Sequence, residues 1–387
     1  MMKKEESIMK KKKLLLLYLL YLAAGFLIGL LTPVILKATT GQETFAKTDG
    51  NVFLLLVISF VLSWMLSIML HEAGHLIAGL LSHYRFISYR FYALTIIRLD
   101  TGWKCRYYKM PGTVGQCLME PTLSYEEQPC LLYHAGGVLA NLLAAACCIL
   151  LMYLMKPQTF LIQITLFMMV IFNVLMAISN GFPFSNQGLS NDGCNFITSR
   201  HDNEYRQYVY NALKIQARLT KGEAMHTIPK TYFTLPKHLD YTKSYHIEAI
   251  LNLISYEQSC GHEDTARSLV QSLVPYEDQL GYLRYHYLYE KIYYQLINGD
   301  LEEAQATLHE SAVLRYLKKM KKMPATLRLR MAEARYLKHD QQQADAYYEQ
   351  AKAMQAKYAI PGICQLELQL MDAIRKNERS KQTTTFL

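Results

Sequence analysis

Four long apolar runs in the first half of the chain constrain its fold more than any other feature. They cover residues 14–36, 52–81, 131–155 and 160–182, and charged side chains are nearly absent from them. About 20 apolar residues in a helix cross the hydrocarbon core of a bilayer, and inside lipid only a helix or a closed barrel satisfies its own backbone hydrogen bonds. The runs therefore predict about four transmembrane helices, the last two forming an antiparallel hairpin.

The second half of the chain has a different composition. After residue 200 it is polar and rich in Tyr, with apolar residues at helical spacing. We expect a transmembrane domain over residues 1–200 and a cytosolic helical-repeat domain over residues 201–387. The predicted fold class is an all-α membrane protein whose cytosolic loop between the second and third spans is small and β-containing, with strand-like stretches at residues 86–97 and 113–119.

The distribution of Lys and Arg indicates which side of the membrane each segment faces. Six Lys precede the first apolar run and six Lys or Arg lie in the loop of residues 82–130, whereas the opposite loops hold only Lys37, Lys47 and Lys156. Because cytoplasmic loops carry the positive excess, we expect a multi-pass cell-membrane protein with its N-terminus and everything after residue 183 in the cytoplasm. This bias accounts for the net charge of +9 without a nucleic-acid partner.

The second apolar run contains the pattern HEAGH, with His71, Glu72 and His75. Four residues apart on a helix, the two imidazoles project from one face and can share a metal ion, while Glu72 is placed to act on a metal-bound water. Zinc held in this way lowers the pKa of its water to about 7. The pattern predicts a hydrolytic site with Zn²⁺ as cofactor and Glu72 as its catalytic acid/base.

Other interpretations of this pattern stay open. HExxH arises by chance in roughly one or two per cent of chains of this size, and two structural histidines satisfied by neighbouring helices would give the same pattern. The membrane setting favours a metal site, because ionised groups inside a span cost about 2.5 kcal/mol or more and usually mark a functional site. No CxxC pair occurs among the eight Cys, which argues against a cysteine-ligated zinc site.

Two histidines and a water leave a tetrahedral zinc ion one ligand short. Asp192 is the best candidate for that ligand, since it follows the fourth run and emerges on the same side as HEAGH. Gly193 beside it permits tight backbone geometry. An ordinary polar turn at the membrane surface is the alternative for this segment, and the other candidate ligands are His83, Asp100 and His134.

These residues resemble the site-2 protease family of intramembrane zinc metalloproteases over roughly residues 52–195. The resemblance rests on HEAGH, on GVLAN at residues 137–141, and on Asn180, Pro183 and Asp192-Gly193. It implies that His71, His75 and Asp192 bind zinc and that Glu72 is the catalytic acid/base. Asn141 and Asn180 match the asparagines of two further family motifs, which implies accessory or substrate-positioning roles.

The chain departs from the family pattern at two places. Val138 stands where the family usually has proline, and the 12 residues from Asn180 to Asp192 are more than the commoner pattern has. The longer spacing requires an elongated loop that returns Asp192 to the metal.

An internal repeat is visible after residue 240. Gly261, Gly299 and His339 are spaced by 38 and 40 residues, and an alanine follows each of them five residues later. The pattern resembles tetratricopeptide-type helix pairs, which stack into arrays with a concave face able to bind a peptide or partner protein. A helical bundle that only stabilises the enzyme is the alternative.

Together these features predict a zinc metalloendopeptidase that hydrolyses peptide bonds in or near transmembrane segments of membrane-bound substrates. The expected partners are a membrane protein or peptide substrate, the lipid bilayer and a protein bound to the helical repeat, which would regulate or supply the enzyme. The alternative is a non-catalytic membrane receptor or scaffold with a structural or degenerate zinc site, for example in peptide export or immunity.

Overall fold

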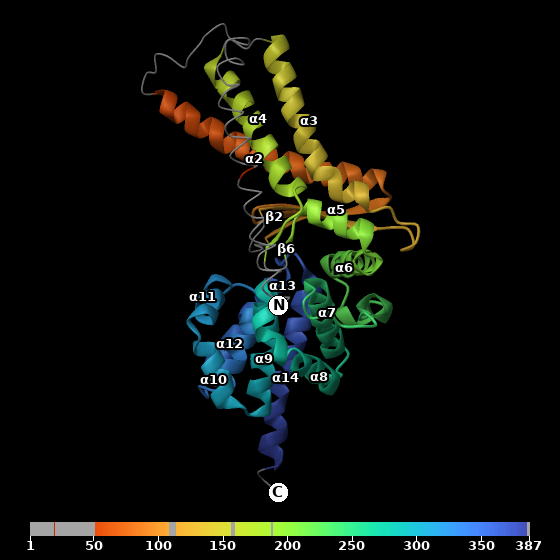
Figure 1. Cartoon of the computed structure of the whole chain (residues 1–387). Helices are drawn as coiled ribbons and strands as arrows, with labels where there is room; N and C mark the ends of the chain where they lie inside the picture. Colours follow the sequence, from red (N-terminus) through yellow and green to blue (C-terminus); the bar gives the residue numbers. More distant parts are fainter. Residues whose placement is uncertain (1–18, 20–50, 108–113, 156–158, 187–188, 385–387) are drawn as a thin grey trace. The chain divides into compact units, whose positions relative to one another are not determined.

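The computed structural model describes residue 19 and residues 51–107, 114–155, 159–186 and 189–384 (Figure 1). Within these ranges the chain is mostly helical, and three helices are long and apolar enough to cross a membrane: α2 (Asn51–Leu81), α3 (Leu131–Met155) and α4 (Phe160–Gly181). They confirm the second, third and fourth predicted spans as helices of that length. The first predicted span, residues 14–36, lies outside the described residues.

The three long helices pack on one another through small and polar side chains and turn apolar ones outward. In Figure 1, α3 and α4 run side by side and α2 crosses them obliquely. Ser59, Ser63 and Ser67 form a buried row along α2. Large apolar side chains such as Leu143 remain 66% exposed, an arrangement that suits a lipid environment and would be a liability in water. These features are those of a membrane protein.

Glycine sets the distance between α2 and α3 where they cross. A Cβ placed on Gly74 would overlap the backbone of Gly136, and a Cβ on Gly136 would overlap that of Gly74. Small residues allow such close backbone approach between helices in lipid. The second half of HEAGH thus lies directly against the beginning of α3.

The predicted β-containing loop is confirmed as a set of short antiparallel strands. Strand β1 (Tyr84–Phe91) pairs with β4 (Gly115–Pro121), from Tyr84 opposite Pro121 to Phe91 opposite Gly115. Strand β2 (Leu94–Leu99) pairs with β3 (Gly102–Tyr107) as a hairpin with a two-residue turn. The register of the first pair shifts between Phe86 and Ser88, which marks a bulge or similar irregularity.

A short segment leads from α4 to a helix that begins with the predicted third ligand. Strands β5 (Ser185–Asn186) and β6 (Leu189–Ser190) form a small antiparallel pair, and α5 (Asp192–His201) follows at once. The segment expected to return Asp192 to the histidines therefore contains a short antiparallel pair just before α5.

The remaining elements are helices and helical turns. The α-helices are α6 (Asn203–Lys221), α7 (Ser244–Ser259), α8 (Glu263–Ser272), α9 (Arg284–Asn298), α10 (Leu301–His309), α11 (Ser311–Lys319), α12 (Pro324–Tyr336), α13 (Gln341–Gln355) and α14 (Pro361–Thr384). Short 3-10 turns lie at Met225–Thr227, Lys230–Phe233, Val274–Gln279 and Gly281–Leu283.

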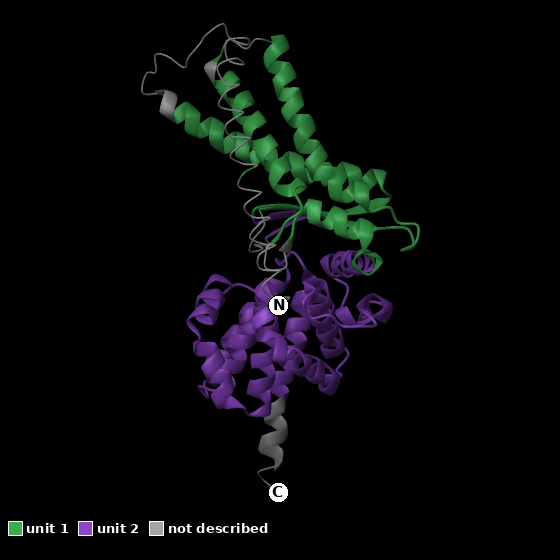
Figure 2. Ribbon diagram, in the orientation of Figure 1, with its two compact units in different colours: residues 1–92, 110–206 green, residues 93–109, 207–387 purple. Residues whose placement is uncertain are grey.

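The chain divides into two compact units, coloured separately in Figure 2. The membrane unit comprises residues 1–92 and 110–206, and the helical unit comprises residues 93–109 and 207–387. The β2–β3 hairpin thus belongs to the helical unit, where Ile97 is fully buried in the core and the Arg106 guanidinium donates to the Tyr358 carbonyl at 3.1 Å. The division of the chain is not simply sequential.

The turns of the predicted repeat coincide with connections between paired helices. Gly261, Gly299 and His339 have φ values of 79°, 92° and 53°, the left-handed conformation that commonly ends a helix. They separate α7 from α8, α9 from α10 and α12 from α13, and the helices of each pair contact one another. The alanines five residues later, 266, 304 and 344, are fully buried. A tetratricopeptide-like array remains a prediction that this pairing favours.

Candidate metal centre

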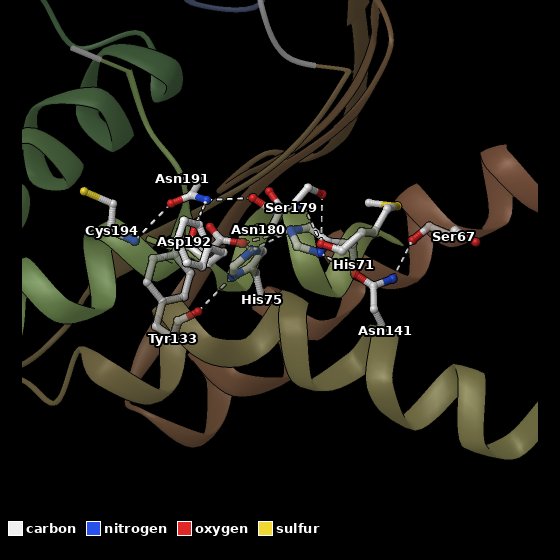
Figure 3. A network of polar contacts seen from close by, with 12 residues as sticks. Ser67, His71, His75, Tyr133, Asn141, Ser179, Asn180, Asn191, Asp192 and Cys194 are labelled. Carbon is white, nitrogen blue, oxygen red and sulfur yellow. Dashed lines mark hydrogen bonds and ion pairs between the residues drawn. The ribbon is translucent and has the colours of Figure 1, made fainter. Parts of the chain in front are cut away.

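Three of the predicted site residues converge on one point although two distant parts of the chain supply them (Figure 3). His71 and His75 lie one turn apart on α2, and Asp192 is the first residue of α5. One Asp192 carboxylate oxygen lies 3.0 Å from His71 Nε2 and 3.2 Å from His75 Nε2. The two Nε2 atoms are 3.3 Å apart. All three side chains are at least four-fifths buried.

These separations match the donor atoms of a small tetrahedral ion. Donors held at about 2.0 Å by zinc lie roughly 3.3 Å from one another. Burial alone would raise the pKa of Asp192, but the two imidazoles outweigh it and hold the pKa of that carboxyl well below its ordinary value, so the carboxylate is ionised. Two imidazoles and one carboxylate form a donor set found in catalytic zinc sites, which leave a further position open.

The backbone at Gly137 leaves room in front of the two imidazoles. A Cβ built on Gly137 would lie 2.5 Å from His71 Nε2 and 2.6 Å from His75 Nε2. Any side chain at this position would therefore press on the ligand nitrogens. A glycine here, in the GVLAN segment of α3, keeps the space for an ion open.

Each imidazole is oriented through its other nitrogen. His75 Nδ1 lies 2.8 Å from the Tyr133 carbonyl oxygen, which can only accept, so Nδ1 carries the proton. His71 Nδ1 lies 2.7 Å from Oδ1 of Asn141. Hydrogen bonds of this kind fix the tautomer of a metal-binding histidine and turn the Nε2 lone pair toward the ion.

Glu72 lies beside the histidines but not among the three convergent ligands. Its side chain is 9% exposed and accepts a hydrogen bond from the backbone N–H of Cys117 on β4. A Cβ on Gly115 would overlap the Glu72 carboxyl group. The start of β4 therefore approaches Glu72 closely because residue 115 has no side chain.

Asn191, which the sequence did not single out, returns Asp192 to the histidines. Its side chain caps α5 and makes four hydrogen bonds between 2.6 and 3.0 Å. Its oxygen accepts from the backbone N–H groups of Phe184 and Cys194. Its nitrogen donates to the carbonyls of Ser179 and Phe182. The β5–β6 hairpin is thus closed at its base against the end of α4, which compensates for the long spacing before Asp192.

The other sequence candidates take different positions. The Asn180 amide donates to the Met176 carbonyl of its own helix at 3.1 Å, and Asn180 is not among the three convergent residues. His134 is buried, and its Nε2 lies 3.3 Å from the Ser199 hydroxyl. Within the described residues the metal-competent group consists of His71, His75 and Asp192, and it includes neither His83, Asp100 nor His134.

Two further polar residues belong to this centre and were missed from the sequence. Asn173 of α4 and Ser67 of α2 are fully buried and bond to Asn141, which itself holds His71. A polar residue in the middle of an apolar span is a signal that the sequence did contain. The partner of such a residue, however, depends on helix packing.

Comparison with known proteins identifies no relative. No family model, no curated protein and no solved structure matches this chain. The described residues form a helical membrane protein with a buried cluster of His71, His75 and Asp192. Its function is therefore inferred from the chemistry of these side chains and their neighbours.

Proposed function

We propose that this protein is an intramembrane zinc metalloendopeptidase of the site-2 protease type. The observation that carries the proposal is the convergence of His71, His75 and Asp192, with ligand atoms 3.0–3.3 Å apart and both Nδ1 atoms held by outer partners. A closed structural zinc site has four protein ligands, whereas the described residues supply three. A centre of this kind keeps one position open for chemistry.

The side chains have separate roles in the proposed hydrolysis. His71, His75 and Asp192 would hold the ion, which when bound supplies Lewis acidity for a peptide carbonyl and for water. Glu72, adjacent in sequence to His71, accepts a proton from the attacking water and delivers it to the leaving amine. The start of β4 at Gly115 packs against the Glu72 carboxyl group and limits its freedom.

The substrate class follows from where the ligands lie. His71 is 10 residues from the end of α2 at Leu81, or about 15 Å along a helix axis, which favours peptide bonds in or near transmembrane segments. A helical substrate must unwind before attack, because its carbonyls are engaged in its own hydrogen bonds. The β4 edge beside Glu72 supports this, since an extended peptide can pair with a strand edge.

The orientation and the helical unit belong to the same proposal. The positive charge of the loops favours a cytoplasmic location for the N-terminus and for the helical unit. The helix pairs around Gly261, Gly299 and His339 favour a surface that binds a protein partner, which would regulate the peptidase or deliver its substrate.

Substitution of the proposed acid/base tests the function. We expect Glu72→Gln to lower cleavage of membrane peptides by about 10²–10⁴-fold while the purified protein keeps its zinc. The measurement compares membrane peptides from cells carrying each variant and the zinc content of each purified protein. Glu126→Gln, an exposed acid in the loop after β4, is the matched control.

Two outcomes would overturn the proposal. Cleavage that continues unchanged in the Glu72→Gln protein would exclude the acid/base role. Purified wild-type protein without a divalent ion, even after zinc is supplied, would exclude the metal centre and leave a receptor or scaffold as the remaining function.

A further inference from the structure

Asn173 is a fully buried carboxamide in the middle of the apolar helix α4, and the proposed hydrolysis does not use it. All of its hydrogen-bonding groups are engaged. Its nitrogen donates to the Met169 carbonyl at 2.8 Å and to the Ser67 hydroxyl at 2.9 Å. Its oxygen accepts from Asn141 Nδ2 at 2.7 Å. A polar group held so completely inside a span needs an explanation beyond packing.

The contacts define which way the Asn173 amide points. A backbone carbonyl can only accept, so the group that faces Met169 O must be the nitrogen and the group that faces Asn141 must be the oxygen. The same reasoning fixes the next amide. Asn141 Nδ2 donates to the Ser67 carbonyl at 3.1 Å and to the Asn173 oxygen, which leaves Asn141 Oδ1 directed at His71.

This chain of amides decides the tautomer of a proposed metal ligand. Asn141 Oδ1 lies 2.7 Å from His71 Nδ1, and an oxygen there requires the proton to be on Nδ1. The lone pair then resides on Nε2, which faces His75 and Asp192. If the Asn141 amide were turned over, its NH₂ group would face Nδ1, the proton would move to Nε2 and His71 could not bind an ion.

We infer that Asn173 is a positioning residue for His71, acting through Asn141 and without touching the ion or the substrate. The inference rests on the proposed metal centre and names a residue that sets its ligand geometry. Three helices take part, since Ser67, Asn141 and Asn173 lie on α2, α3 and α4. Outer-shell partners of this kind affect metal affinity by about 10–100-fold.

A neighbouring polar contact separates this role from simple helix adhesion. Thr165 lies two turns before Asn173 on α4, and its hydroxyl is hydrogen-bonded with the Ser59 hydroxyl at 3.0 Å. The Ser63 hydroxyl donates to the Thr165 carbonyl at 3.1 Å. These bonds also join α2 to α4 but do not include a histidine. Thr165→Val, which keeps the side-chain shape, is therefore a matched control.

The test measures zinc affinity of the full-length purified protein by competition with a chelator. We expect Asn173→Leu to weaken zinc binding by about 10–100-fold, and Thr165→Val to leave it near that of the wild type. Asn173→Thr is a second variant that tolerates folding better, since a threonine hydroxyl can bond to the carbonyl four residues earlier in a helix. It provides no carboxamide oxygen for Asn141 and is expected to weaken binding similarly.

A rescue and a spectroscopic measurement exclude a structural explanation. In Asn141→Asp protein either carboxylate oxygen can accept from His71 Nδ1, so orientation by Asn173 is no longer needed, and adding Asn173→Leu is expected to cost little further affinity. Nitrogen-15 NMR of the metal-free proteins, with His71 assigned by its substitution, is expected to show Nδ1–H in the wild type and a larger share of Nε2–H in Asn173→Thr, where only the Ser67 carbonyl still orients Asn141.

The outcomes distinguish this inference from the proposed function. Wild-type protein that binds no zinc would overturn the metal centre itself. Wild-type protein that binds zinc, together with Asn173 variants that bind as tightly as Thr165→Val and keep the His71 tautomer, would overturn the positioning role and leave the metal centre intact.

Discussion

Each of the two units contains a cluster of buried polar side chains, and the two clusters differ in how their charges are arranged. In the helical unit, Arg328 is 1% exposed and its guanidinium donates to Glu290 at 2.5 Å and to Glu367 at 2.6 Å. In the membrane unit, His71, His75 and Asp192 direct electron-rich atoms at one point. The first cluster contains a permanent cation, the Arg328 guanidinium, whereas the second consists of two imidazoles and one carboxylate.

This difference indicates which cluster is structural. Burial lowers the pKa of a guanidinium, but Glu290 and Glu367 outweigh that effect and raise the pKa of Arg328, so it stays charged. The Tyr293 ring lies 4.6 Å from the guanidinium carbon and covers it. Opposite charges paired in this way join α9, α12 and α14. The three convergent donors are the arrangement that we propose holds an ion.

The largest effect is expected from removing a ligand in the membrane unit. His75→Ala should reduce bound zinc to background and cleavage by at least about 10³-fold, because the Lewis acidity of the metal contributes several kcal/mol. Zinc content and peptide cleavage measure the effect. His246→Ala removes a buried histidine of the helical unit and should leave zinc content and cleavage unchanged. Equal losses in the two variants would contradict a metal-binding role specific to His75.

A loss of stability without loss of metal is expected in the helical unit. Arg328→Met leaves two buried carboxylates uncompensated and should destabilise that unit by about 3–5 kcal/mol, while zinc content stays unchanged. Hydrogen exchange of the full-length protein resolves the two units separately. Replacing Arg328, Glu290 and Glu367 together by Met should cost less than the single change, and a single variant as stable as the wild type would contradict the structural role.

The smallest effect is expected from the loop that positions Asp192. Asn191→Ala removes the clamp at the base of the β5–β6 hairpin and should weaken zinc binding by about 10–100-fold without abolishing it. Chelator competition provides the measurement. Asn195→Ala on α5, which removes the hydrogen-bond partner of the Tyr205 hydroxyl, is the control. Unchanged zinc affinity in the Asn191 variant would show that the Asn191 hydrogen bonds are not needed to position Asp192.

The part of the centre that could be predicted depends on local geometry. His71 and His75 lie on one face because a helix repeats every 3.6 residues, and the apolar runs predicted the helices that carry them. The turns at Gly261 and Gly299 were visible for the same reason, since a helix end in the left-handed conformation favours glycine. Each of these features is encoded within a few neighbouring residues.

The remaining contacts depend on how distant segments meet. Asp192 is 117 residues from His75, and its position depends on backbone carbonyls at residues 179 and 182 that no side-chain pattern reveals. The role of Asn173 was hidden because its polar character is evident in sequence but its partners on two other helices are not. The position of the β2–β3 hairpin in the helical unit likewise followed from burial of Ile97.

The sequence alone determined the apolar helices, the paired imidazoles and the turns between helices, because hydrophobicity and backbone propensity act over short stretches of chain. Only the tertiary structure decided that Asp192 meets those imidazoles and that Asn173, through Asn141, orients one of them. Hydrogen bonds and metal ligands require atoms within about 3 Å, and such proximity between distant segments arises only when the helices pack.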